Sequence, residues 1–266
     1  MADTLLHITI AHEIATHPGL AAPVAQLIQR YPDAWAMGSV LVDLPYYDTL
    51  LRSGLQTLRS RPAVYHPFGQ TLHHSQCRRL CIELVKAAAT DEMRVLAYGA
   101  LTHFAVDIVF HAEIERRIQH TDISHDTLER QIGILCHQYL LGHSGVGTPY
   151  TITSTFLFPD PDWPTFVNNV LSGIYNGAPG VSVLRKWQRS LRAFGLLYSQ
   201  PWFPWLSTRA PDDSMLRRTA TALCAQAIEN AIEYVNAAFN YRSGNLHIDA
   251  FRQCLPLRRM TDGEPE

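Results

Sequence analysis

The sequence predicts an all-α protein built as a multi-helix bundle. Apolar residues recur at intervals of three and four along most of the chain, and no stretch alternates apolar and polar residues as a half-buried strand does. Hydrophobic residues make up 47% of the 266 residues and charged residues 17%, which is enough apolar surface for a large buried core. No internal repeat divides the chain. We therefore expect a single all-α domain over residues 1–266.

Glycine, proline and capping residues divide the first part of the chain into short elements. Apolar periodicity predicts helices over residues 4–17 and 22–30, and Pro23 is tolerated because it falls in the first turn of the second helix. Residues 36–70 contain several glycines and prolines and are expected to form loops with short helical pieces. Thr71 is expected to cap the next helix. The apolar stripe of that helix consists of Cys77, Leu80, Cys81, Leu84, Val85 and Ala88.

Two longer helices follow. Thr90 or Asp91 begins the first of them, which continues to about Gln119. Ser124 opens the second helix and Gly142 ends it. The apolar stripe of the second helix consists of Leu128, Ile132, Leu135, Cys136 and Tyr139.

The rest of the chain is also predicted to be helical. Residues 143–165 have no helical period and are expected to form a long loop. Helices are expected over about residues 164–176, 181–199 and 214–241. All but one of the 13 histidines precede residue 144. The candidate metal-site half is therefore residues 1–142, and residues 143–266 form a C-terminal helical elaboration.

Composition narrows the possible functions. The net charge of -2 gives neither the basic footprint of a nucleic-acid-binding protein nor a polybasic membrane patch. No window approaches the roughly 18 uncharged apolar residues of a transmembrane segment, and the N-terminal residues lack the basic start of a secretory signal. The five cysteines form no C-x-x-C pair, which is typical of reduced thiols, so we expect a cytoplasmic protein.

Three polar residues interrupt the most apolar of the expected helices. His103, Asp107 and His111 are spaced by four residues, and four residues advance an α-helix by about 400°, so the three side chains share one stripe. Burying such groups without partners costs several kcal/mol. A divalent cation removes this cost, because neutral imidazole nitrogens and a carboxylate are zinc ligands. The alternative is that Asp107 accepts hydrogen bonds from two core histidines.

The next helix repeats the same spacing with His125 and Glu129. If the chain turns back near residue 120, His111 and Glu129 lie symmetrically about the turn and face each other, with His125 nearby. Two histidines and one glutamate form a zinc site that leaves a coordination position open for water or substrate. The alternative is that the two residues of the second helix lie in solvent.

Together these motifs resemble the zinc-dependent phospholipase C family, whose superfamily also contains the P1-type nucleases. The family pattern is H-x-x-x-D, a further His and then H-x-x-x-E, and here it occurs in YGALTHFAVDIVFHAEI and SHDTLERQ. The resemblance is closest to the prokaryotic branch, whose helix G-x-x-x-H-x-x-x-D-x-x-x-H begins here at Gly99. It covers roughly residues 5–142 and implies the all-α fold of the phospholipase C/P1 nuclease type.

Three further segments carry the resemblance. LLHITIAHEIA resembles the N-terminal segment that supplies an early metal ligand, here His7. GSVLVDLPYYD resembles the aspartate loop of the family and points to Asp43. GQTLHHSQCRRL resembles its His-His helix start and offers His73 or His74, with His66 as the weaker candidate.

The resemblance also implies how these residues share zinc. One ion would be held by Asp43, His73 or His74, His103 and Asp107. A second would be held by His111, His125 and Glu129. Asp107 would bridge to a third ion, which His7 helps to bind. The secreted phospholipases complete that third site with an N-terminal Trp, whereas this chain begins Met-Ala-Asp, so we expect two or three zinc ions.

The reaction implied by the resemblance is hydrolysis of a phosphodiester, with phospholipid head groups as the leading substrate class. Asp43, at the edge of the site, is expected to orient or deprotonate the attacking water as the general base. A phospholipid needs an apolar rim around the site. The candidates for this rim are Phe156, Phe158, Trp163, Trp202, Phe203 and Trp205. Packing of these aromatic residues against the C-terminal helices explains them equally well. The alternative functions are a P1-type nuclease or another phosphodiesterase, and a non-catalytic metal-binding helical protein.

Overall fold

The structure, a computed structural model, describes residues 4–48, 66–141, 162–198 and 214–255. These residues form helices and no strand, which confirms the all-α prediction. In chain order the helices are α1 (Thr4–Ala15), α2 (Ala22–Arg30), α3 (Pro32–Ser39), the 3-10 helix η1 (Leu41–Asp48), α5 (Pro67–His74), α6 (Cys77–Ala87), α7 (Asp91–Ile118), α8 (His125–Leu141), α9 (Trp163–Ile174), α10 (Val181–Tyr198), α11 (Ser214–Arg242) and α12 (Ile248–Cys254).

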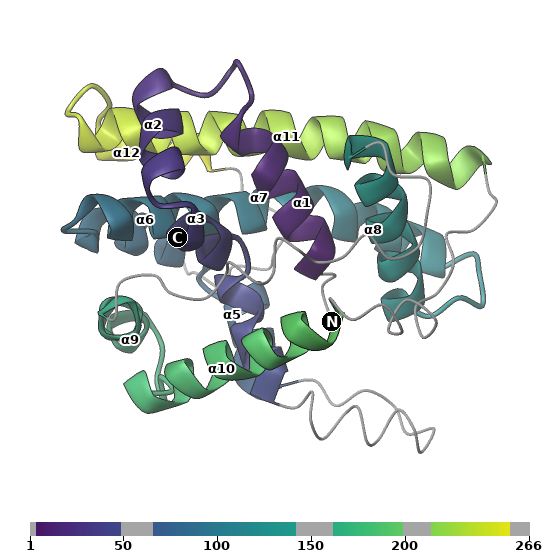
Figure 1. Cartoon of the computed structure of the whole chain (residues 1–266), viewed down its shortest axis with the longest axis horizontal. Coiled ribbons are helices and arrows are strands. Elements are labelled where there is room, and N and C mark those ends of the chain that lie inside the picture. The colour runs from purple at the N-terminus through teal and green to yellow at the C-terminus, as the bar shows by residue number, and fades with distance from the viewer. Residues whose placement is uncertain (1–3, 49–65, 142–161, 199–213, 256–266) are drawn as a thin grey trace.

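The central helix of the molecule is α7. It begins after Thr90, whose hydroxyl accepts a hydrogen bond from the amide of Met93 at 3.2 Å, so the predicted cap is confirmed. In Figure 1, α11 lies along α7, and α1, α3 and α6 also contact it. Almost every residue from Val95 to Phe110 is buried, so the polar side chains of this stretch are buried with it.

The length and apolarity of α7 would also suit a membrane span. Its most apolar 18-residue window has a mean hydropathy of 1.4, and 83% of that window is buried inside the fold. The helix still contains charged residues such as Arg94 and Asp107, so the expectation that no window approaches 18 uncharged apolar residues stands. Here α7 is a core helix, because α3, α6 and α11 pack against it.

Two glycines let α3 and α7 cross at close range. A Cβ added to Gly99 would lie 2.5 Å from the carbonyl oxygen of Trp35 and 2.9 Å from the Cα of Gly38, closer than real atoms approach. The two helix backbones therefore touch directly, which only glycine permits. This contact places the end of α3, including Ser39, beside the turn of α7 that follows Gly99.

Several local expectations are wrong. Thr71 lies inside α5, where its hydroxyl donates to the carbonyl of Pro67, and α6 begins only after Gln76, whose φ of 53° separates the two helices. Tyr139 is 53% exposed, whereas the other members of its predicted stripe are buried. The short helix α12 was not predicted, because its seven residues are too few to show a period. Gly142 and the expected loop up to residue 161 lie outside the described residues.

The C-terminal helices pack around the first half of the chain. α11 contacts α1, α7 and α8, while α9 and α10 contact each other and α10 packs on η1. Trp163, at the start of α9, is buried in the same core as the apolar residues of α1 and α7, so it is a packing residue rather than part of a rim. The other proposed rim residues lie outside the described part of the chain: Phe156, Phe158, Trp202, Phe203 and Trp205.

Candidate metal centre

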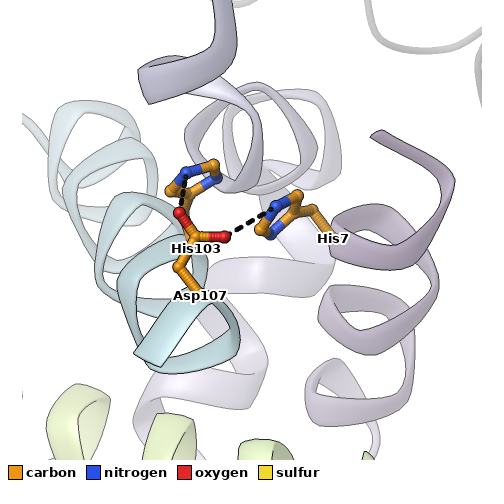
Figure 2. Close-up of side chains that lie close together, drawn as sticks. All are labelled: His7, His103 and Asp107. Carbon is orange, nitrogen blue, oxygen red and sulfur yellow. Dashed lines mark ion pairs between the residues drawn. The ribbon is translucent and has the colours of Figure 1, made fainter. Parts of the chain in front are cut away.

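Four separate elements bring polar side chains to one point beside α7. α1 supplies His7, η1 supplies Asp43, α5 supplies His73, and α7 supplies both His103 and Asp107. Each of these five residues is at most 4% exposed. In Figure 2 the carboxylate of Asp107 points between the imidazole rings of His7 and His103. Their assembly in an apolar interior is the central feature of the molecule.

The inner part of the centre has the dimensions of a zinc site. The Nε2 atom of His103 lies 3.3 Å from Nε2 of His73 and 3.2 Å from Oδ2 of Asp107. Nε2 of His73 lies 3.2 Å from Oδ1 of Asp43 and 3.5 Å from the same Asp107 oxygen. Ligands about 2.0–2.1 Å from a tetrahedral zinc are separated from one another by about 3.3 Å. The contacts of His73 and His103 with each other and with the two carboxylates therefore match the spacing of zinc ligands.

Backbone carbonyls orient both inner histidines. Nδ1 of His103 lies 3.0 Å from the carbonyl oxygen of Ser39, and Nδ1 of His73 lies 2.7 Å from that of Gly69. Because a carbonyl oxygen only accepts hydrogen bonds, each Nδ1 carries the proton and donates it. The Nε2 atoms of the two rings then face each other at 3.3 Å. This arrangement is stable when a cation lies between them, and such hydrogen bonds are the usual support of metal-bound histidines.

Buried polar atoms without hydrogen bonds argue against a purely structural cluster. Both carboxylate oxygens of Asp43, Oδ2 of Asp107, Nδ1 of His7 and Nε2 of His111 are buried and make no hydrogen bond of good geometry within the described residues. Each such atom costs about 1–3 kcal/mol. The alternative in which Asp107 simply accepts hydrogen bonds from core histidines leaves this cost uncompensated, whereas bound cations remove it.

A second set of ligands adjoins the first on the outer side. Oδ1 of Asp107 lies 3.3 Å from Nε2 of His7 and 3.6 Å from Nε2 of His111. Nε2 of His111 lies 3.5 Å from Oε1 of Glu129, so the predicted facing of α7 and α8 is confirmed. Nδ1 of His125 lies 3.8 Å from the other Glu129 oxygen. Because the side chains of His111 and His125 are 24% and 28% exposed, this part of the centre reaches solvent.

The pKa shifts of residues in the centre show that it favours positive charge. Burial by itself would lower the pKa of His111, but the carboxylates of Asp107 and Glu129 raise that pKa to about 9. Burial would raise the pKa of Asp107, yet the charges of His103 and His111 hold it well below its ordinary value. The pKa of Asp43 is lowered in the same way, because His103 and His73 outweigh burial. Without a metal, protons must supply the balancing charge.

The structure separates the three candidate histidines around α5. His73 enters the inner set, whereas its neighbour His74 is exposed. His66 caps α5, since its Nδ1 accepts a hydrogen bond from the amide of Phe68 at 3.2 Å, and its Nε2 lies 4.0 Å from Asp48. The geometry therefore favours His73 as the ligand.

Two further features of the centre differ from expectation. Asp43, expected at the edge of the site, is fully buried within it. His137 on α8 is not among the predicted site residues, yet its Nδ1 lies 3.0 Å from the hydroxyl of Thr9 on α1, which links the helix of His7 to the helix of Glu129. His137 follows Glu129 by eight residues, two steps of four, so it lies on the same stripe of α8, and this spacing is visible in the sequence.

The fold and the centre define a class: an all-α protein whose helices converge on buried histidines and carboxylates that can hold divalent cations. A family model described as zinc dependent phospholipase C matches residues 6–172, which is more than half of the chain. The chain belongs to this family, and its two groups of three buried His and Asp ligands agree with a zinc-dependent hydrolase. Comparisons with curated proteins and with solved structures find no match.

Proposed function

We propose that this chain hydrolyses phosphodiesters, with phospholipids as its leading substrate class, by means of two or three zinc ions. Membership of the zinc-dependent phospholipase C family supports this proposal, and so does the polar centre beside α7. The observation that carries the proposal is the set of separations of 3.2–3.5 Å among the inner ligand atoms of Asp43, His73, His103 and Asp107.

The ligand assignment follows the two sets. Asp43, His73, His103 and Asp107 would hold an inner ion. His111, His125 and Glu129 would hold an outer ion, and the carboxylate of Asp107 would be shared between the two sets. His7 lies 3.3 Å from Oδ1 of Asp107 and stacks on the ring of His103 at 4.0 Å, so it would contribute to the same centre.

The chemistry of the centre divides between the metal and the protein. Zinc, when bound, lowers the pKa of a coordinated water to about 7 and stabilises negative charge on phosphoryl oxygens. Asp43 keeps its negative charge at neutral pH because its pKa is lowered, which suits it better to orient the attacking water than to take its proton. The exposed edges of His111 and His125 mark the side from which the phosphodiester enters.

Metal analysis of the purified protein tests the proposal directly. We expect two or three zinc ions per chain, and fewer than one would contradict the metal centre. Hydrolysis of a phosphatidylcholine analogue, of bis-nitrophenyl phosphate and of single-stranded nucleic acid would then be compared. Preference for the nucleic acid indicates a P1-type nuclease. Bound zinc with no activity on any of the three indicates a non-catalytic metal-binding protein.

Adjacent histidines offer a matched pair of variants. His73→Ala removes an inner ligand and is expected to lower zinc affinity and hydrolysis by at least about a hundredfold. His74→Ala makes the same change on an exposed neighbour, and its effect is expected to stay within about threefold. Zinc content and initial rates measure both. A larger loss in the His74 variant would exchange the roles of the two residues.

A further inference from the structure

Positive charge is concentrated in one segment of the C-terminal half. Residues 163–211 contain five basic side chains and no acidic one, which leaves 17 basic and 24 acidic side chains in the rest of the chain. The rest of the chain is therefore acidic and this one segment is wholly cationic, a contrast that the net charge of -2 conceals. Four of the five basic residues lie within the single helix α10.

The basic residues of α10 lie on its outer face. Its inner face is apolar and packs into the core through Leu184, Trp187 and Leu191, all of which are buried. Arg185, Lys186, Arg189 and Arg192 are all exposed. Arg185, Arg189 and Arg192 are spaced by four and three residues, so they follow one stripe along the helix.

The position of α10 relates this stripe to the metal centre. α10 packs on η1, the element that carries Asp43. Lys186 forms an ion pair with Asp48 at the end of η1, which attaches the helix to that segment. Figure 1 shows α10 on the opposite side of the molecule from α11, crossing below α5. A surface bound to the outer face of α10 would therefore lie close to the element that positions the catalytic aspartate.

We propose that the arginine stripe of α10 docks the protein on an anionic phospholipid surface. This inference rests on the proposed phospholipase function, and it adds a binding site separate from the metal centre. A row of arginines matches a plane of negatively charged head groups, to which each basic residue adds attraction within the Debye length of about 8 Å. A nucleic acid is the less favoured occupant, because the ring of Trp187 is buried and cannot stack on bases.

The test is cosedimentation of the full-length protein with phosphatidylcholine vesicles that contain or lack phosphatidylserine. We expect binding to the anionic vesicles, weakening as salt increases. The triple variant R185Q/R189Q/R192Q is expected to lose on the order of a hundredfold in vesicle affinity. The control R30Q/R217Q/R218Q makes the same change in net charge at exposed positions of α2 and α11 and should bind like the wild type.

Other outcomes overturn the proposal or separate it from the proposed function. Equal binding to both kinds of vesicle, or equal loss in the two triple variants, would refute the docking site. Tighter binding to a single-stranded oligonucleotide than to anionic vesicles would assign the stripe to nucleic acid instead. Hydrolysis of soluble bis-nitrophenyl phosphate should be unchanged in both variants. Because vesicle binding is measured without turnover, an inactive but vesicle-binding protein would refute the phospholipase function and leave the docking site standing.

Discussion

Replacing Asp107 by Asn is expected to remove more zinc from the protein than replacing Asp43 by Asn. Asp107 is the residue that faces both ligand sets: its Oδ2 lies 3.2 Å from His103, and its Oδ1 lies 3.6 Å from His111. The substitution preserves shape and removes the negative charge that the two proposed ions would share. Even the loss of a residue that only supports a ligand lowers metal affinity about 10–100-fold, so the loss of a bridging carboxylate should exceed that range.

Asp43→Asn is the matched control for this experiment, because it makes the same chemical change at an equally buried carboxylate. Asp43 belongs only to the inner set, where it contacts His73, so its variant is expected to retain the outer ion while hydrolysis falls. Zinc content, measured after dialysis against a weak chelator, ranks the two variants. Circular dichroism of both proteins shows whether the fold persists. If Asp43→Asn lost more zinc than Asp107→Asn, the assignment of Asp107 as the bridge would be wrong.

Gly99→Ala is expected to destabilise the protein and to weaken the metal centre together. The new methyl group would lie 2.5 Å from the carbonyl oxygen of Trp35, which is backbone and can move only if α3 moves. Overpacking of this kind costs about 1–3 kcal/mol of unfolding free energy. A shift of α3 also carries away the carbonyl of Ser39, which orients His103. Zinc affinity should therefore fall although no ligand has been changed.

Gly173→Ala is the control for the glycine experiment. Gly173 also lies in a helix, α9, but a Cβ added there meets nothing within 4 Å. Alanine is favoured over glycine inside a helix by about 0.5–1 kcal/mol, so this variant should be as stable as the wild type or slightly more stable. Urea unfolding and zinc titration are measured on both proteins. A Gly99→Ala variant with wild-type stability and zinc affinity would show that the close crossing of α3 and α7 is not needed.

The shared face of the candidate ligands on α7 and α8 could be predicted because a helix is a local structure. A spacing of four residues keeps side chains on one stripe whatever surrounds the helix, so His103, Asp107 and His111 were certain to share a face once the helix was recognised. The hairpin between the two helices then placed Glu129 opposite His111, and the structure has them 3.5 Å apart. The family resemblance added His7 and Asp43, which no local period could have connected to α7.

The choice between His73 and His74 shows where such reasoning stops. Consecutive residues of a helix point about 100° apart, so His73 and His74 cannot both face α7. Which one faces α7 depends on how α5 is rotated against η1. Gly69 controls that contact, because a Cβ there would lie 2.8 Å from the ring of Tyr46. This close approach turns His73 inward and leaves His74 exposed.

Helical class, the two spaced motifs and the family could thus be recognised from the order of residues alone, since each depends on periods or motifs that are short along the chain. Convergence of α1, η1, α5 and α7 on one point, the carbonyl supports of the histidines and the packing of α10 on η1 required the folded molecule. Segments tens of residues apart meet only through the packing of their apolar faces, and distances set by packing are not encoded in any local pattern.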